Sequence, residues 1–191
     1  VASVQSARIQ IYFIDNDDFF TKRKSTIADK NGVFFEDNDD RTIFFSRGVI
    51  ETIRKLNWPP DIIHCNGWIS ALIPIYIKKA FKDNPLFSDS KIVMSIYDDG
   101  FAETFRNGFD KKLKMPGIAP KDVKILKTTD YVNLMKVAID FSDAVIFGSE
   151  KINPELEEYV KSSEKPFLEY HSPENYVDAY NDFYDSLLKE K

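Results

Sequence analysis

Apolar residues recur along this chain with two periods, one typical of strands and one typical of helices. A period of two predicts a strand over residues 8–14, and residues 1–5 form the other arm of a predicted hairpin. Short apolar runs predict further strands at 61–65, 91–97, 144–149 and 167–170. Apolar residues at helical spacing predict helices at 39–57, 68–82, 130–142, 153–162 and 172–188. Strands and helices therefore alternate along the chain.

This alternation indicates a parallel sheet with helices on both faces. We predict an α/β fold, a Rossmann-like, doubly wound parallel sheet. Ligands of such sheets bind beyond the carboxyl ends of the strands. Candidate chemistry is therefore expected directly after each strand, at Asp15-Asn16, Asn66-Gly67-Trp68, Asp98-Asp99-Gly100 and Gly148-Ser149-Glu150.

Composition and charge argue against several classes of protein. The 26 basic and 31 acidic side chains give a net charge of −5, which is unlike a basic nucleic-acid-binding domain. No apolar run is long enough to span a bilayer. With Cys65 as the single cysteine and only two histidines, we expect no intramolecular disulfide, no metal site and no cofactor. A reducing, cytoplasmic location fits this cysteine content best.

The segment from His64 to Trp68 ends one predicted strand and opens a helix. Backbone N–H groups at such a turn can meet a phosphate or a sugar hydroxyl, and Trp68 can stack on a sugar ring. The alternative is a sharp turn with Trp68 packed in the core. Residue types alone favour this second interpretation.

Two acidic segments can each be interpreted either as part of a functional site or as a structural feature. Asp37 lies in an acidic run, 36–41, where it either orients a sugar hydroxyl or, with its neighbours, complements a helix dipole. Asp98-Asp99 is either an acid/base or Mg²⁺ site, or a pair of solvated loop carboxylates. Neither a P-loop nor a dinucleotide-binding glycine motif is present.

Four segments resemble, in order and spacing, motifs of bacterial glycogen and starch synthases. They are IYFIDNDDFF at 11–20, DNDDRTIFFSR at 37–47, PDIIHCNGWISALIP at 60–74 and LMKVAIDFSDAV at 134–145. The agreement extends from residue 8 to about residue 154. It is specific for the N-terminal, acceptor-side domain of that family.

The resemblance implies a two-domain glucosyltransferase of the GT-B fold. Such an enzyme moves glucose from ADP-glucose to the non-reducing end of an α-1,4-glucan, with retention of configuration. Residues 1–191 would form one N-terminal domain whose upstream part is missing from the chain, and the nucleotide-binding second domain is absent. The helix at 172–190 would imitate the last GT-B helix, which crosses back to pack on the first domain.

The chain departs from the family motif at Asn66-Gly67, where the family has His-Asp. Asn66 can hydrogen-bond a sugar but cannot carry a proton, so we name no catalytic residue. The resemblance implies substrate contacts from Asp37, Asn66, Gly67 and Trp68.

Two functions follow from this departure. The chain is either an enzyme component in glycogen biosynthesis, inactive alone, or a non-catalytic glucan-binding or regulatory derivative. A partner subunit would supply the second domain to an enzyme component. A homo-oligomer would instead cover an apolar face at Phe19, Phe20 and Phe101.

Overall fold

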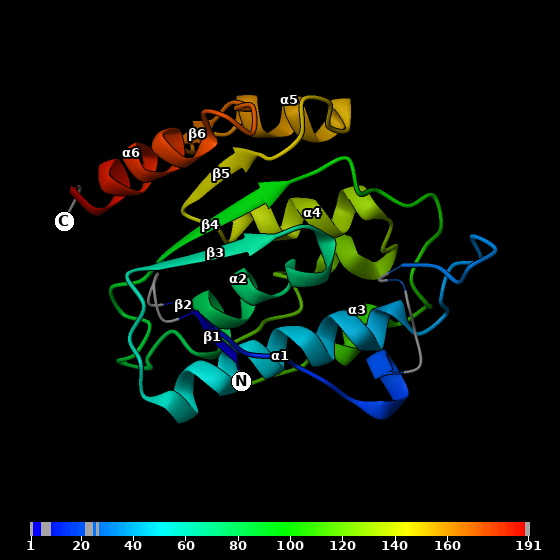
Figure 1. The fold of residues 1–191 in the computed structure, drawn as a ribbon. Coiled ribbons are helices and arrows are strands. Elements are labelled where there is room, and N and C mark those ends of the chain that lie inside the picture. Colours follow the sequence, from blue (N-terminus) through cyan, green and yellow to red (C-terminus); the bar gives the residue numbers. More distant parts are fainter. Residues whose placement is uncertain (1, 5–8, 22–24, 26, 190–191) are drawn as a thin grey trace.

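A computed structural model describes residues 2–4, 9–21, 25 and 27–189 of the chain (Figure 1). Its main sheet has four parallel strands in the order β3-β4-β5-β6. The strands are β3 (Ile62–Asn66), β4 (Lys91–Ile96), β5 (Ala144–Phe147) and β6 (Phe167–Leu168). The predicted parallel α/β sheet is therefore confirmed.

Alternating side chains of the strands point to two different cores. Val93 and Ile146 pack with Leu187 on one face of the sheet. Met94 and Val145 are the sequence neighbours of Val93 and Ile146, and they belong to the larger core on the other face. Because both faces are covered, most residues of the strands are apolar, as expected for a buried parallel sheet.

The larger core lies between the sheet and several helices (Figure 1). These are α1 (Asn38–Leu56), α2 (Ile73–Ile75), α4 (Tyr131–Asp140) and α5 (Pro154–Ser162). Asn153 caps α5 by accepting hydrogen bonds from the N–H groups of Glu155 and Leu156, with Pro154 at the first helical position. The opposite face is covered by α6 (Tyr176–Lys189), which runs back across the sheet (Figure 1).

The helix predicted at 68–82 is broken into three short pieces. A 3₁₀ turn, Trp68–Ser70, precedes α2, and a π-helical turn, Tyr76–Ala80, follows it. Pro74 lies at the start of α2, where its missing N–H costs no helical hydrogen bond. The segment predicted as helix at 68–82 is therefore helical but interrupted, as a proline at this position predicts.

The predicted N-terminal hairpin is present, but it stands outside the main sheet. β1 (Ala2–Val4) pairs in antiparallel fashion with β2 (Ile9–Ile11). Residues 1 and 5–8 of the predicted arms lie outside the described residues. The alternation of strands and helices had placed residues 8–14 in the parallel sheet, which was wrong. Its apolar positions Ile9, Ile11 and Phe13 are all exposed, so this strand has no buried face.

The segment between β4 and α4 is mostly irregular, as its prolines and glycine predict. It contains only α3 (Phe109–Lys112) and a 3₁₀ turn, Lys124–Lys127. A further π-helical turn, Asp17–Thr21, precedes α1. None of the helices in the described part of the chain combines the length and apolar character that a membrane span requires.

Candidate functional site

A pocket of about 420 Å³ opens at the carboxyl ends of the parallel strands, where ligands of this fold class bind. Residues from two sources line it. The ends of β3, β4 and β5 contribute His64, Asn66, Tyr97 and Gly148. The segment that follows β6 contributes Tyr170, His171, Pro173, Tyr176 and Tyr180.

The side chains of Asn66 and Tyr97 are joined at one side of this pocket. The Tyr97 hydroxyl donates a hydrogen bond to Asn66 Oδ1 over 2.7 Å. Gly148 lies against the Tyr97 ring, and a Cβ at this position would overlap the ring. The close packing therefore holds Tyr97 in place. One N–H of the Asn66 amide donates to the His64 carbonyl over 3.4 Å, and the other is left for further partners.

Gly67 allows the sharp turn between β3 and the segment that follows. Its φ of +66° lies in the region that favours glycine, and a Cβ here would overlap the carboxylate of Asp99. The Trp68 N–H donates to Asp99 Oδ2 over 3.3 Å, and the Ser70 hydroxyl donates to the Gly67 carbonyl over 2.9 Å. The turn is therefore fixed by backbone conformation and by two side chains.

Asp99, which follows β4, joins the turn after β3 to α4 through hydrogen bonds. Besides the Trp68 N–H, it accepts a hydrogen bond of 2.9 Å from the Tyr131 hydroxyl. Burial raises the pKa of Asp99, while the hydrogen bonds from Tyr131 and Trp68 act in the opposite direction. The solvated interpretation of the pair is therefore wrong for Asp99, although Asp98 is exposed. Among the described residues, no cluster of ligating side chains could hold a metal ion.

The Trp68 side chain packs in the core. Only 4% of its surface is exposed, and its indole meets the Phe101 and Phe105 rings edge to face. The predicted stacking of Trp68 on a sugar ring is therefore not available in this structure. Only its backbone contributes to the turn at the strand end.

The structure separates Asp37 from Asn66, Gly67 and Trp68. Asp37 lies at the start of α1 and lines a different pocket of about 380 Å³, together with Arg106. No side-chain cap bond to α1 is formed by Asp37. The predicted substrate contacts therefore do not converge on one pocket.

The acidic run around Asp37 has a structural role at Asp39. This carboxylate is fully buried and accepts hydrogen bonds from Arg106 and from Lys112, the latter over 2.7 Å. Asp40 accepts from the same two cations. Burial raises the pKa of Asp40, but Lys112 and Arg106 outweigh it, and the net effect lowers the pKa. The first turn of α1 is thus tied to the irregular segment.

The three aromatic residues proposed for an oligomer contact are only partly exposed. Phe19 and Phe20 pack on Phe44, with ring centroids 5.3 and 6.1 Å apart. Phe101 stacks on Phe105 at 5.3 Å. These rings therefore do not form the exposed apolar face that was expected.

His64 lies beneath α6 and has a partner at each ring nitrogen. Ser95 Oγ is 2.6 Å from Nε2, and the Tyr184 hydroxyl is 2.7 Å from Nδ1. Burial lowers the pKa of His64 to about 4, so the ring is neutral near pH 7. Sequence analysis placed no function on His64 itself, nor on the tyrosines of α6 that face it.

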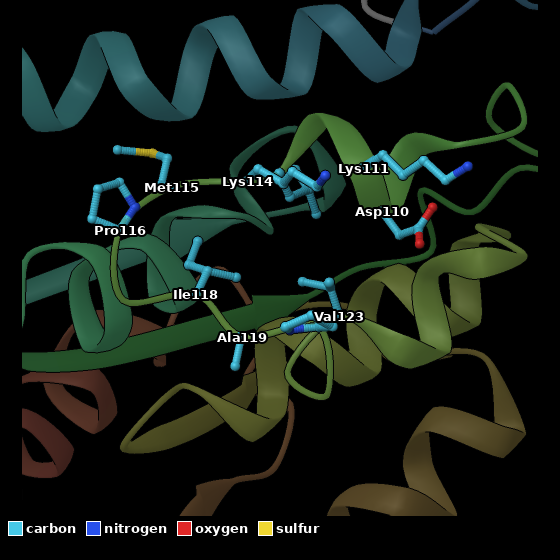
Figure 2. A pocket seen from close by; sticks show the side chains of 10 residues that line it. Asp110, Lys111, Lys114, Met115, Pro116, Ile118, Ala119 and Val123 are labelled. Carbon is cyan, nitrogen blue, oxygen red and sulfur yellow. The ribbon is translucent and has the colours of Figure 1, made fainter.

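A third pocket, of about 670 Å³, lies elsewhere on the molecule. Figure 2 shows its lining along α3 and the loop that leads to Val123, with aliphatic side chains and the stems of Lys111 and Lys114. None of the residues predicted to contact substrate lines it.

Comparisons with known proteins agree on one family. The sequence model of the starch synthase catalytic domain matches residues 1–165. A glycogen synthase of Chlorobium limicola is 31% identical over 159 residues, which cover 82% of this chain and 31% of that protein. A glycogen synthase of Pelodictyon phaeoclathratiforme is 28% identical over 203 residues, which cover 100% of this chain and 40% of that protein.

A solved structure shares the fold. It is the catalytic domain of starch synthase IV from Arabidopsis thaliana bound to ADP and acarbose, with a TM-score of 0.56 and 19% identity. The match covers 74% of this chain and 31% of that one. This chain spans less than half the length of these relatives. It belongs to the starch synthase catalytic domain family.

Proposed function

We propose that this chain is the acceptor-side part of a glucosyltransferase that moves glucose from ADP-glucose to the end of an α-glucan. The observation that carries the proposal is the match of residues 1–165 to the starch synthase catalytic domain. The relatives are named glycogen synthases, which favours transfer over a non-catalytic glucan-binding derivative. The solved neighbour, by its title, binds ADP and acarbose.

In this proposal the strand-end pocket receives the sugar. Asn66 occupies the position where the family has a histidine, and its amide N–H₂ donates to a sugar hydroxyl while Tyr97 holds the amide oxygen. Gly67 keeps the turn narrow, so the sugar approaches the backbone closely. Asp37 contacts substrate only at a distance from this pocket, on the Arg106 side.

The departing ADP needs electrostatic stabilisation that the strand-end pocket does not provide. Among the residues that the structure describes, neither lysine nor arginine lines it. We therefore propose that a second domain or a partner subunit supplies the donor side of the active site. We propose that residues 1–191 act as one acceptor domain, with the helix at 172–190 packed on it, in the cytoplasm and in glycogen biosynthesis.

The test is incorporation of labelled glucose from ADP-glucose into glycogen by the chain together with a separately expressed donor domain of a glycogen synthase. We expect turnover that Asn66→Ala reduces by about tenfold, because a positioned hydrogen bond to the sugar is lost. Asn181→Ala, which changes an exposed asparagine of α6, is the matched control and is expected to retain the rate.

Turnover by the chain alone would contradict the assignment of the donor side to another domain or subunit. Turnover that appears only when the donor domain is present would support the proposal. Absence of turnover even with the donor domain would contradict the proposal and leave the non-catalytic derivative as the function.

A further inference from the structure

The pocket of about 670 Å³ beside α3, here called the α3 pocket, is built by one continuous stretch of chain. Its lining residues all fall between Asp110 and Val123, in the irregular segment that joins β4 to α4. The α3 pocket shares no lining residue with the strand-end pocket. Its volume lies in the range of small-molecule sites. A ligand here would therefore be additional to the sugar and the nucleotide of the proposed function.

The inner wall of the α3 pocket is apolar. Leu113 is fully buried and Val123 is 5% exposed, and both belong to the larger core. Met115 and Ile118 pack against the same core but are only partly buried, so part of each side chain is open to the pocket. An apolar group placed against them would be removed from water, which is favourable.

The neighbouring chain holds the loop of the α3 pocket in one shape. Gly117 lies so close to the backbone at Lys79 that a Cβ would overlap the Lys79 carbonyl oxygen. Asp122 Oδ2 accepts a hydrogen bond of 2.8 Å from the Ala119 N–H, and Asp122 Oδ1 forms an ion pair of 3.0 Å with Lys79 Nζ. A ligand would therefore meet a preformed wall and would not need to order the loop when it binds.

Two lysines give one end of the α3 pocket a positive charge. Figure 2 shows Lys111 with Asp110 at the end opposite Met115, and the Lys114 side chain extends between the two ends. Within the described part of the chain, neither Lys111 nor Lys114 has an ion-pair partner, whereas the carboxylates at the start of α1 hold Lys112. Asp110 offsets one of the two charges, so the lining carries a net charge of +1.

The surroundings of the α3 pocket strengthen this positive charge. Residues 110–127 contain six lysines and two aspartates, a net charge of +4, although the whole chain carries −5. A local field of this sign attracts anions and repels cations. Lysine acts as a point charge on a flexible stem, so it recognises the charge of a ligand rather than a planar shape.

We propose that the α3 pocket binds a small molecule with an apolar body and a single anionic group. The apolar body lies against Met115 and Ile118 above the buried Leu113, and the anionic group lies between Lys111 and Lys114. A single negative charge matches the net charge of the lining. This site does not rest on the proposed function, because its residues contact neither the predicted sugar nor the strand ends.

The experiment is a fluorescence titration of the full chain with 8-anilinonaphthalene-1-sulfonate and, separately, with N-phenyl-1-naphthylamine, which has the same rings but no sulfonate. We expect the sulfonate to bind with a dissociation constant at or below about 0.1 mM and more tightly than the neutral probe. The double variant Lys111→Gln/Lys114→Gln is expected to weaken sulfonate binding by about tenfold and to change binding of the neutral probe by less than about twofold. Both lysines are exposed, so this variant is expected to fold.

Matched variants locate the site. Lys124→Gln/Lys127→Gln removes two exposed lysines of the same segment that do not line the pocket, and it is expected to leave sulfonate binding within about twofold. Ile118→Ser is expected to weaken binding of both probes by about fivefold through lost apolar contact. Ile125→Ser is its control, since Ile125 is 41% exposed and lies outside the lining. Decanoate is expected to displace the sulfonate, and inorganic phosphate, which has no apolar body, is not.

Several results would overturn the proposal. One is the absence of saturable sulfonate binding up to about 1 mM. Another is equal weakening by the two double lysine variants, which would indicate attraction to the basic segment as a whole. Binding of the neutral probe as tight as that of the sulfonate would remove the role of the lysines. Displacement by phosphate as effective as that by decanoate would remove the role of the apolar wall. Glucose transfer is measured separately, so failure of this site and failure of the proposed function are distinguishable.

Discussion

The Tyr184 hydroxyl lies 2.7 Å from Nδ1 of His64 and so joins α6 to the first strand of the parallel sheet. The other nitrogen of the ring, Nε2, is 2.6 Å from Ser95 Oγ on β4. A neutral imidazole donates from one nitrogen and accepts at the other, so both contacts are satisfied without a charge. Together with Leu187, this contact holds α6 on the face opposite the larger core.

The first prediction concerns the pH dependence of folding stability. Burial lowers the pKa of His64 to about 4, below its ordinary value of 6.5. The unfolded chain therefore takes up a proton before the folded chain does, and stability falls as the pH drops from 6.5 towards 4. The full loss from this group is about 3 kcal/mol, measured as the free energy of urea unfolding at each pH.

Replacing the histidine tests the origin of this slope. His64→Gln is expected to flatten the dependence between pH 6.5 and pH 4, whatever its effect on absolute stability. His171→Gln, which changes the other histidine of the chain, is expected to leave the slope intact. An unchanged slope in His64→Gln would show that other groups cause it.

Local signals in the sequence predicted most of the fold. The helix predicted at 39–57 is observed as Asn38–Leu56, because acidic residues mark its start and Trp58-Pro59-Pro60 its end. The hairpin was predicted, but its separation from the parallel sheet was not. Which strands pair depends on distant residues, and the alternation of apolar and polar residues is the same in either sheet.

The candidate site was predicted only in part. The turn after β3 was located because a strand end followed by glycine is a local pattern. The pocket itself joins residues far apart in sequence: Tyr97 and Asn66 are separated by 31 positions, and Tyr184 and His64 by 120. The spacing of the tyrosines predicted that they share one face of α6. It did not predict that this face would pack against the ends of the strands.

The second prediction uses the single cysteine. Cys65 is buried in β3, and burial raises the pKa of its thiol to about 12. Because the thiolate is the reactive form, alkylation by iodoacetamide at pH 8 is expected to be at least about 100-fold slower in the folded chain than in urea. Mass spectrometry of timed samples measures both rates. Alkylation of the folded chain at the rate of a free thiol would contradict the burial of Cys65.

The third prediction separates two neighbouring carboxylates. Asp39 is fully buried and Asp40 is not, although both accept hydrogen bonds from Arg106 and Lys112. Asp39→Asn is expected to cost about 2–3 kcal/mol of unfolding free energy, because two cations lose a buried partner but remain accessible to water. Asp40→Asn is the matched control, at about 0.5 kcal/mol. Equal losses would mean that burial of Asp39 adds nothing to the network.

The last prediction tests the turn at the strand end. Gly67 has a φ of +66°, and a Cβ there would overlap the Asp99 carboxylate. The ψ of Gly67 is 178°, and this extended positive-φ conformation is essentially restricted to glycine. Gly67→Ala therefore combines this backbone cost, about 1–3 kcal/mol, with displacement of Asp99 from the Trp68 N–H, for a total of about 2–6 kcal/mol.

Gly108 provides a comparison at a less restricted glycine. Its φ of +84° and ψ of 14° lie in the left-handed helical region, where alanine costs about 1 kcal/mol, and a Cβ at Gly108 would meet no atom within 4 Å. Gly108→Ala is therefore expected to lose only about 1 kcal/mol in the same urea titration. The larger loss in Gly67→Ala measures its more restricted backbone together with the overlap with Asp99. Equal losses in the two variants would contradict both costs and would mean that Asp99 yields easily, although it accepts hydrogen bonds from Tyr131 and Trp68.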